Sequence, residues 1–458
     1  MDSIARPPLP IGTDVKSEAD VCPICLVEFH GHDVVPVDVK TQCRTQCGHR
    51  FHLDCVSEQF VYQPVGSRQC AMCRQDPMPV VNLNTGESHP DTSFPNQAFY
   101  DACDYGDLDQ VERSLAEGVN VNAVMTYGLT ALMLASIRGY TDVVERLINA
   151  GADVNTARNE DDGTPLLFAV EENNTDCVKL LINKGADLNA GAKNGATPLS
   201  IAAEMGNTDC LKALIEAKAN LNVKDEDGNT PLLIAAAKGK TDCVKALIKA
   251  KADLNAGPKY GVTPLLLAAQ ENNADCLKLL IKAGADINTR TEDGITPLYL
   301  AAQNNSIDCA ELLINAEADL NARRTEDGAT PLFIAARRGN TECLKRLIKA
   351  GADTNIPGED GTTALFIAAQ KGNTDCVELL INTEADLNAR RTEDGATPLF
   401  IAAREGNIEC LKLLIRAEAD INAALSDGTT PLAIATEMGN ADCARLLTNA
   451  GAERGQRR

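Results

Sequence analysis

Residues 195–222 read GATPLSIAAEMGNTDCLKALIEAKANLN, and variants of this stretch recur through most of the 458-residue chain. Thr197 followed by Pro198 supplies a helix N-cap and a first helical residue. Gly206 is expected to end this helix, and the polar residues after it to start a second one. The apolar residues of the second helix fall on one face at helical spacing: Leu211, Leu214 and Ile215. The stretch therefore predicts two short antiparallel helices.

The unit repeats mostly every 33 or 34 residues, as the turn glycines show. These glycines are Gly128, Gly163, Gly195, Gly228, Gly261, Gly294, Gly328, Gly361, Gly395 and Gly428. This period and the T-P-L-x-x-A core resemble the ankyrin repeat. A degenerate first unit near residues 98–121 lacks the T-P-L turn and brings the count to about eleven. The resemblance implies a mainly α fold, an ankyrin-repeat α-solenoid with β-hairpin tips over residues 96–455, in which stacked neighbours stabilise each unit.

The composition narrows the possible partners and locations. A net charge of −22 disfavours binding to phosphate backbones, so we expect no nucleic-acid partner. No run approaches the roughly 20 apolar residues of a membrane helix, and the polar start MDSIARPPLP lacks the apolar core of a signal peptide. A cytoplasmic or nuclear protein without a membrane partner is therefore expected.

Nine of the 17 cysteines occur once per unit, where the second helix begins. They are Cys177, Cys210, Cys243, Cys276, Cys309, Cys343, Cys376, Cys410 and Cys443. A zinc or disulfide ladder is one interpretation. Packed helix layers lie about 8 to 10 Å apart, beyond the roughly 7 Å limit on the Cα separation of a disulfide. We therefore expect small buried thiols.

Five units lack the glycine of the A-G-A-D segment that follows the second helix. Its replacements are Lys218, Lys251, Glu317, Glu384 and Glu418. If the position is left-handed, each replacement costs around 1 kcal/mol. These junctions between units are expected to be less stable than those that keep the glycine.

Seven further cysteines lie between Cys22 and Cys73, among histidines. The ligand-type residues form four pairs: Cys22 and Cys25, Cys47 and His49, His52 and Cys55, Cys70 and Cys73. Zinc takes four Cys or His ligands tetrahedrally, and a C-x2-C turn places two sulfurs on one ion, so eight ligands imply two closed structural sites. We expect Cys43, His30 and His32 to remain outside the metal sites.

Residues 21–74, with the segment CGHRFHLDC at residues 47–55, resemble the RING finger of the two-histidine variety. The resemblance implies interleaved pairs around two structural Zn²⁺ ions. The first zinc would take Cys22, Cys25, His52 and Cys55, and the second Cys47, His49, Cys70 and Cys73. A module of this size buries too little apolar surface to fold alone, and each structural zinc can contribute on the order of 10 kcal/mol.

The same resemblance implies a ubiquitin-protein ligase without a covalent catalytic residue, because both zinc sites would be filled and catalysis would consist of positioning. Ile24, which lies between the first two cysteines, and Arg74, directly after the last, match family positions that contact the ubiquitin-conjugating enzyme and bridge it to ubiquitin. Two positions depart from the pattern: Gln59 replaces a frequent tryptophan and Ala71 a frequent proline. Phe60 beside Gln59 is a candidate for the missing apolar contact.

The expected organisation is a flexible tail over residues 1–20, a zinc-stapled RING domain over 21–75, a linker over 76–95, the ankyrin repeats over 96–455 and a tail over 456–458. The expected function is transfer of ubiquitin from a conjugating enzyme to lysines of a protein substrate held by the repeats. A zinc-containing ankyrin scaffold without enzymatic activity is the alternative.

Two near-identical units carry arginines close to one phenylalanine per unit, and both residue types are typical interface anchors. The candidate substrate-binding residues are Arg323, Arg324, Arg337, Arg338, Phe333, Phe366, Arg390, Arg391, Phe400 and Arg404. A packing role for the phenylalanines is the alternative, because ankyrin repeats often have a junction-stabilising histidine at this position. Retention of the charges after a recent duplication also fits the pattern.

Overall fold

The structure is a computed structural model. It describes residues 96–453 continuously and, before them, residues 42–46, 50–52, 60, 70, 74, 78–82 and 88–89. The chain forms two compact units, Met1–Asp187 and Leu188–Arg458. In the described residues, no helix is both long and apolar enough to cross a lipid bilayer.

The first unit contains a four-stranded antiparallel sheet in the order β2-β1-β3-β4. Its strands are β1 (Gln42–Arg44), β2 (Arg50–His52), β3 (Val80–Asn82) and β4 (Ser88–His89). In the β1–β2 ladder Cys43 lies opposite Phe51, and in the β1–β3 ladder Arg44 lies opposite Val81. Strands β3 and β4 fall within the predicted linker, so the sheet crosses the predicted domain boundary at residue 75. The β-branched pair Val80 and Val81 favours a strand there, and Val80 is fully buried.

Three helix pairs complete the first unit. They are α2 (Gln97–Tyr105) with α3 (Leu108–Ala116), α4 (Ala131–Arg138) with α5 (Thr141–Asn149), and α6 (Pro165–Glu171) with α7 (Thr175–Asn183). The pair α2–α3 is the degenerate unit, and the helix N-cap there is Asn96 rather than threonine. It packs on α4, as an end cap of a repeat array must.

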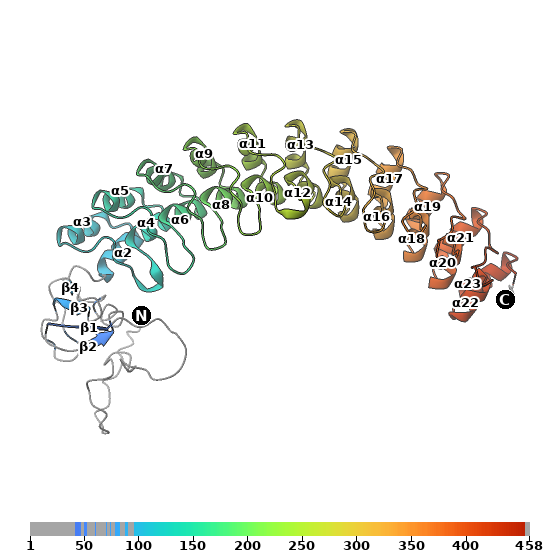
Figure 1. The fold of residues 1–458 in the computed structure, drawn as a ribbon, viewed down its shortest axis with the longest axis horizontal. Helices are drawn as coiled ribbons and strands as arrows, with labels where there is room; N and C mark the ends of the chain where they lie inside the picture. The colour runs from blue at the N-terminus through green and yellow to red at the C-terminus, as the bar shows by residue number, and fades with distance from the viewer. Residues whose placement is uncertain are drawn as a thin grey trace, which may run out of the picture. The chain divides into compact units, whose positions relative to one another are not determined.

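Eight helix pairs form the second unit (Figure 1). The first helices are α8 (Pro198–Met205), α10 (Pro231–Ala237), α12 (Pro264–Gln270), α14 (Pro297–Asn304), α16 (Pro331–Arg338), α18 (Ala364–Lys371), α20 (Pro398–Glu405) and α22 (Pro431–Glu437). The second helices are α9 (Thr208–Glu216), α11 (Thr241–Lys249), α13 (Ala274–Lys282), α15 (Ile307–Asn315), α17 (Thr341–Lys349), α19 (Thr374–Ile381), α21 (Ile408–Arg416) and α23 (Ala441–Asn449). Within this unit the first helices form the inner row of the curve and the second helices the outer row (Figure 1).

Each first helix of the second unit begins at a threonine N-cap, as the sequence predicts. At α8 the Thr197 hydroxyl accepts a hydrogen bond from the Ser200 amide at 3.3 Å, and Gly206 ends the helix with φ 83°. Leu199, Ala202 and Ala203 are then buried between neighbouring pairs. Removal of these apolar faces from water is what stabilises units that are too small to fold alone.

The turns at the tips differ from the predicted β-hairpins. In residues 96–453 they contain no strand, and short turns close them instead, as where the Gly228 amide donates to the Asp225 carbonyl at 2.9 Å. In the 158–163 turn the left-handed residue is Asp162, with φ 58°, because Gly163 directly precedes the threonine N-cap, whereas the other turn glycines lie two residues before it.

Asparagines at the start of the second helices connect neighbouring pairs. Asn273 Nδ2 donates to the carbonyls of Ala236 and Ala237 at 2.9 and 2.8 Å, at the end of the first helix of the preceding pair. Five other asparagines donate the same pair of hydrogen bonds: Asn174, Asn340, Asn373, Asn407 and Asn440. Carbonyls at a helix end have no partner within the helix, so the asparagines satisfy them.

The nine repeat cysteines are buried and form no disulfide, which confirms the prediction of packed thiols. Several bridge neighbouring pairs weakly, as where Cys276 Sγ lies 3.7 Å from the Thr241 hydroxyl. Burial raises the pKa of Cys309 to about 12 and that of Cys343 to about 11. These thiols are therefore protonated and unreactive at neutral pH.

The five replacements of the junction glycine are left-handed, which meets the condition for their expected cost. Their φ angles are 68° at Lys218, 68° at Lys251, 63° at Glu317, 60° at Glu384 and 65° at Glu418.

We predict that Glu418→Gly raises the free energy of unfolding by about 1 kcal/mol, because a left-handed conformation costs an L-residue roughly that much. Gly351 occupies the same position of the near-identical unit, with φ 93°, and a Cβ added there would have no atom within 4 Å. Gly351→Glu is thus the matched reverse change and should lower stability by a similar amount. Urea unfolding followed by circular dichroism measures both, and unchanged midpoints in both variants would contradict the prediction.

We also predict that stability falls at alkaline pH partly through the thiols. The folded pKa of Cys309, about 12, lies above the unfolded value. Its contribution is therefore complete below about pH 8.5 and is lost as the pH rises toward the folded pKa. Between about pH 9 and about pH 11, the free energy of unfolding should fall with pH in both proteins. The fall should be about 1.4 kcal/mol per pH unit smaller in Cys309→Ala than in wild type. The cavity left by Cys309→Ala lowers stability equally at every pH, so it does not affect the slope of the unfolding free energy against pH. Equal slopes in the two proteins would refute the raised pKa of Cys309.

Candidate functional site

Most of the predicted zinc ligands lie outside the described residues: Cys22, Cys25, Cys47, His49, Cys55 and Cys73. Ile24, His30 and His32 also lie outside them. His52 ends strand β2, but its side chain is not described. Cys70 is therefore the one predicted ligand whose side chain the structure describes, and it is buried, with 1% of its surface exposed. The two zinc sites remain predictions.

Arg74 is exposed, and its backbone is hydrogen-bonded to that of Cys70. The Arg74 amide donates to the Cys70 carbonyl at 2.8 Å, and Arg74 adopts a left-handed φ of 60°. A metal bound to Cys70 would, through this hydrogen bond, also fix the position of the Arg74 backbone and so the point from which its side chain extends. Phe60 is fully buried, so its ring can support a docking surface from beneath but does not present itself to a partner.

The phenylalanines of the candidate substrate site are also buried. Phe333, Phe366 and Phe400 have 7%, 1% and 1% of their surface exposed, so they pack between pairs as the alternative interpretation held. The arginines around them are what a partner can reach. Arg323, Arg338 and Arg390 are exposed, whereas Arg324, Arg337, Arg391 and Arg404 are half-buried.

The turn before α16 holds two of these arginines around one carboxylate. Arg324 Nε lies 3.0 Å from Asp327 Oδ1, and Arg337 Nη1, from the last turn of α16, lies 3.8 Å from Asp327 Oδ2. Arg324 also pairs with Glu326, which is largely exposed. A solvent-exposed pair of this kind contributes little stability, so Glu326 is easily displaced.

The turn before α20 repeats the arginine–aspartate pair, but its second arginine pairs with a different carboxylate. Arg391 Nε lies 2.9 Å from Asp394 Oδ1, and the Arg391 guanidinium lies 5.5 Å from the centre of the Phe366 ring. The hydrogen bond from Arg391 lowers the pKa of Asp394, and the charge of Arg404 contributes to the same effect. Arg404 itself pairs with Glu405 at 2.9 Å.

Sequence reasoning missed Tyr299 on α14, which occupies the position of the three phenylalanines. It is 2% exposed, and its hydroxyl makes no hydrogen bond of normal length and angle among the described residues. Burial raises the pKa of this hydroxyl, and Arg324 and Arg337 partly offset the rise through their charges, Arg324 also as a hydrogen-bond donor. The signal was present in the sequence, because P-L-Y at residues 297–299 aligns with P-L-F at residues 331–333 and 398–400.

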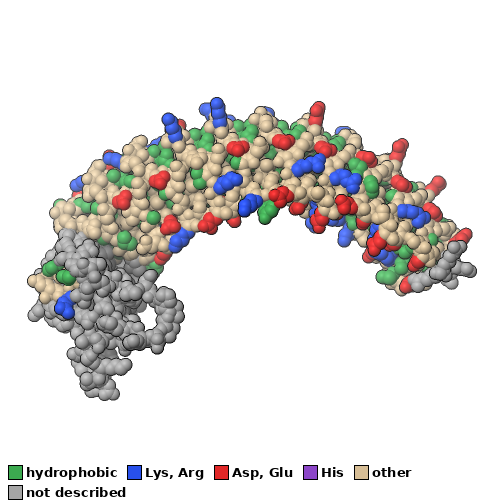
Figure 2. Space-filling view, in the orientation of Figure 1, with side chains coloured by type: hydrophobic (Ala, Val, Ile, Leu, Met, Phe, Trp, Pro, Cys, Tyr) green, Lys and Arg blue, Asp and Glu red, His purple; other side chains and the backbone are tan. Residues whose placement is uncertain are grey.

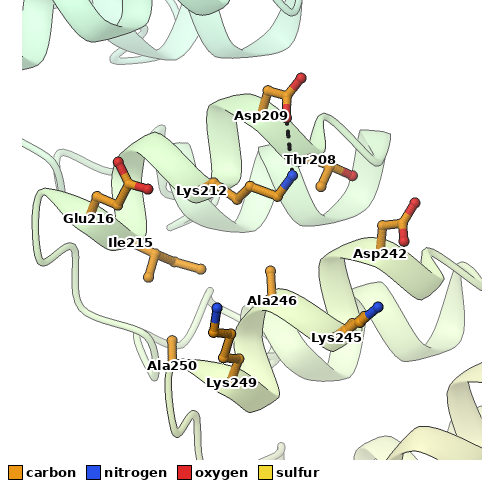
Figure 3. A pocket seen from close by; sticks show the side chains of 10 residues that line it. All are labelled: Thr208, Asp209, Lys212, Ile215, Glu216, Asp242, Lys245, Ala246, Lys249 and Ala250. Atoms are coloured by element: carbon orange, nitrogen blue, oxygen red, sulfur yellow. Dashed lines mark hydrogen bonds and ion pairs between the residues drawn. The ribbon is translucent and has the colours of Figure 1, made fainter.

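The outer row carries a separate groove of about 780 Å³ between α9 and α11 (Figure 3). It exists because Ala246 is small where the next second helix has Leu279. Its charged lining residues are Asp209, Lys212, Glu216, Asp242, Lys245 and Lys249. Lys212 pairs with Asp209 at 3.2 Å (Figure 3). Equal numbers of acidic and basic groups give this groove no preferred sign of charge.

The surface of the second unit is likewise of mixed charge on the face shown in Figure 2. No group of three or more His, Cys, Asp and Glu side chains that could hold a metal occurs in the part of the chain that the structure describes. The arginine-bearing turns stand out from this mixed background because the same arrangement occurs twice.

Comparison with known proteins agrees with this architecture. The family model for ankyrin repeats (3 copies) matches seven overlapping segments, residues 98–192, 156–225, 188–258, 256–324, 288–357, 317–391 and 384–457.

Two curated proteins are similar to short parts of the chain. YahD of Escherichia coli (strain K12), whose name carries the words ankyrin repeat protein, is 44% identical over 54 residues, 12% of this chain and 27% of that protein. The ankyrin repeat-containing protein YIL001W of Saccharomyces cerevisiae (strain ATCC 204508 / S288c) is 41% identical over 59 residues, 13% of this chain and 12% of that protein. The matches thus cover well under two thirds of either relative. Because the family model matches most of residues 98–457, the chain belongs to the ankyrin-repeat family.

Proposed function

We propose that this protein is a RING-type ubiquitin-protein ligase. Residues 21–75 would recruit a ubiquitin-conjugating enzyme that carries ubiquitin, and the ankyrin repeats would hold the protein substrate. The observation that carries the proposal is the series of four ligand pairs with the segment CGHRFHLDC at residues 47–55. Ankyrin arrays are protein-interaction scaffolds, and the second half of the proposal extends that role to a substrate.

The donor set fits structural zinc, because six thiols and two imidazoles make two tetrahedral sets. Cys22, Cys25, His52 and Cys55 would hold one ion, and Cys47, His49, Cys70 and Cys73 the other. Bound zinc would supply the cross-links that fold the module. The chain's own contribution to transfer is orientation: Ile24 would contact the conjugating enzyme, and the forked guanidinium of Arg74 would bridge it to ubiquitin.

A non-enzymatic scaffold is the second candidate function. It is favoured by Gln59 and Ala71, which depart from the RING pattern, and by the burial of Phe60, which leaves the missing tryptophan contact unreplaced at the surface. Both functions require the zinc module and the repeats. They differ in whether the conjugating enzyme is engaged productively.

We predict two zinc ions per chain by native mass spectrometry. Cys73→Ser should lower the content to one, because three remaining ligands bind the second ion more weakly. Cys43→Ser is the matched control and should retain two ions, since Cys43 is expected not to bind metal. A strong chelator should abolish zinc binding without changing the thermal unfolding of the repeats. A chain without zinc would contradict the RING proposal.

We predict zinc-dependent self-ubiquitination with at least one member of a panel of conjugating enzymes. Arg74→Ala should slow it about tenfold or more, the effect of losing one charge-assisted hydrogen bond in the reactive complex. Arg44→Ala, which removes another exposed arginine of the same unit, is the control and should be as active as wild type. If the zinc-loaded wild type is inert with every enzyme, the scaffold function replaces the ligase.

A further inference from the structure

Two stretches of the second unit are near-identical copies. Residues 317–353 and 384–420 are the same except at five positions, and one repeat lies between the two copies. The arginine arrangements described above occupy equivalent positions in them. The first contains Arg324, Asp327 and Arg337, and the second Arg391, Asp394 and Arg404.

In the first copy, the two arginines outnumber the carboxylate that lies between them. Arg324 and Arg337 side chains are 21% and 31% exposed, so both can reach a bound molecule. Two guanidinium groups carry ten N–H donors, and Asp327 together with Glu326 does not satisfy all of them. Glu326 is largely exposed and easily displaced, so a carboxylate supplied from outside can bind the arginines in its place.

Tyr299 provides an independent observation at the same place. Its buried hydroxyl makes no hydrogen bond of normal length and angle among the described residues, and Arg324 is the donor that lies near it. Buried polar groups normally have well-formed hydrogen bonds, so a bound group that completes this one is one explanation of its environment. In the second copy the equivalent residue is Phe366, so the two sites share their arginines and differ in this hydroxyl.

The surroundings of the two sites also favour an acidic partner. Basic residues lie in the last turns of three successive first helices: Arg337 and Arg338 on α16, Lys371 on α18, and Arg404 on α20, where it pairs with Glu405. At physiological salt, charges more than about 8 Å apart are largely screened from one another. The net charge of −22 on the whole chain therefore does not prevent an acidic segment from binding here.

We propose that the two arginine sites bind two groups of carboxylates on one extended, acidic segment of a partner protein. The proposal deepens the proposed function, because it rests on the repeats being the part that holds a substrate. Sites two repeats apart are separated by about 16 to 20 Å. An extended chain advances about 3.3 Å per residue, so the two acidic groups should be about six residues apart.

The test uses the full chain and a fluorescent peptide, EEGSGSEE, in which the two acidic pairs are six residues apart. Fluorescence anisotropy measures its affinity. The peptide EEEEGSGS, with all carboxylates adjacent, should bind about tenfold more weakly, because it cannot occupy both sites at once. A neutral peptide, QQGSGSQQ, should not bind. Equal affinities of the two acidic peptides, or tighter binding of KKGSGSKK, would overturn the proposal.

Matched variants locate the binding. Arg404→Gln should reduce the affinity for EEGSGSEE to that for EEEEGSGS, and the double variant with Arg337→Gln should abolish binding. Arg445→Gln removes an ion-paired arginine of α23 and should have no effect. Tyr299→Phe should lower the affinity severalfold without lowering the unfolding midpoint, a combination that a purely structural role would not give. Unchanged binding by the double variant would sink the proposal.

The two proposals fail separately in this design. Peptide binding does not require the conjugating enzyme, and self-ubiquitination does not require the arginine sites. A double variant that loses the peptide but still ubiquitinates itself supports both proposals. A wild type that binds the peptide but is inert as a ligase supports the arginine sites alone, and one that is active but ignores the peptide refutes only the arginine sites.

Discussion

The side-chain amide that opens most second helices fixes the spacing of the helix pairs in the second unit. Asn273 satisfies two carbonyls at the end of α10 that the helix itself leaves unpaired. A Cβ at Gly239 would come within 2.7 Å of Asn273 Oδ1, so a larger residue there would disturb this asparagine. The buried alanine and leucine faces, the thiols between neighbouring pairs and the arginines at the turns all depend on this spacing.

A regular array of this kind separates stability from recognition. The residues that repeat in every copy are buried or satisfy the backbone, and they leave the last turn of each first helix and the tip of each turn free to vary. Arg337 and Arg404 occupy such positions, whereas Tyr299, a buried residue of the first turn of α14, replaces an apolar residue of other copies. Function in this chain therefore has to be sought where the copies differ, because what they share is needed for stacking.

Much of the fold could be predicted because its signals are local. The threonine caps, the left-handed Lys218 and Glu384 and the buried cysteines each follow from the conformational or packing preference of one residue in a known place. The role of Asn273 could not be predicted, because it depends on how one pair stacks on the next. The strand at Val80 was missed for the same reason, since its partner lies far away in the sequence.

The site was less predictable than the fold. The arginines were found from their repetition, but the phenylalanines beside them proved to be buried, since periodicity alone cannot tell a surface ring from a packed one. The Tyr299 hydroxyl, which makes no hydrogen bond of normal length and angle among the described residues, became visible only with its surroundings.

The left-handed glutamates have one more consequence. Glu317 and Glu384 each lie a few residues before an arginine-bearing turn, at Arg324 and Arg391. A strained junction is the place where one pair can tilt on its neighbour at the lowest cost, since each pair contacts only those beside it. Two of the five strained junctions therefore lie just before the arginine sites. Tilting at these two junctions would let the distance between the sites adjust to partners whose own spacing varies.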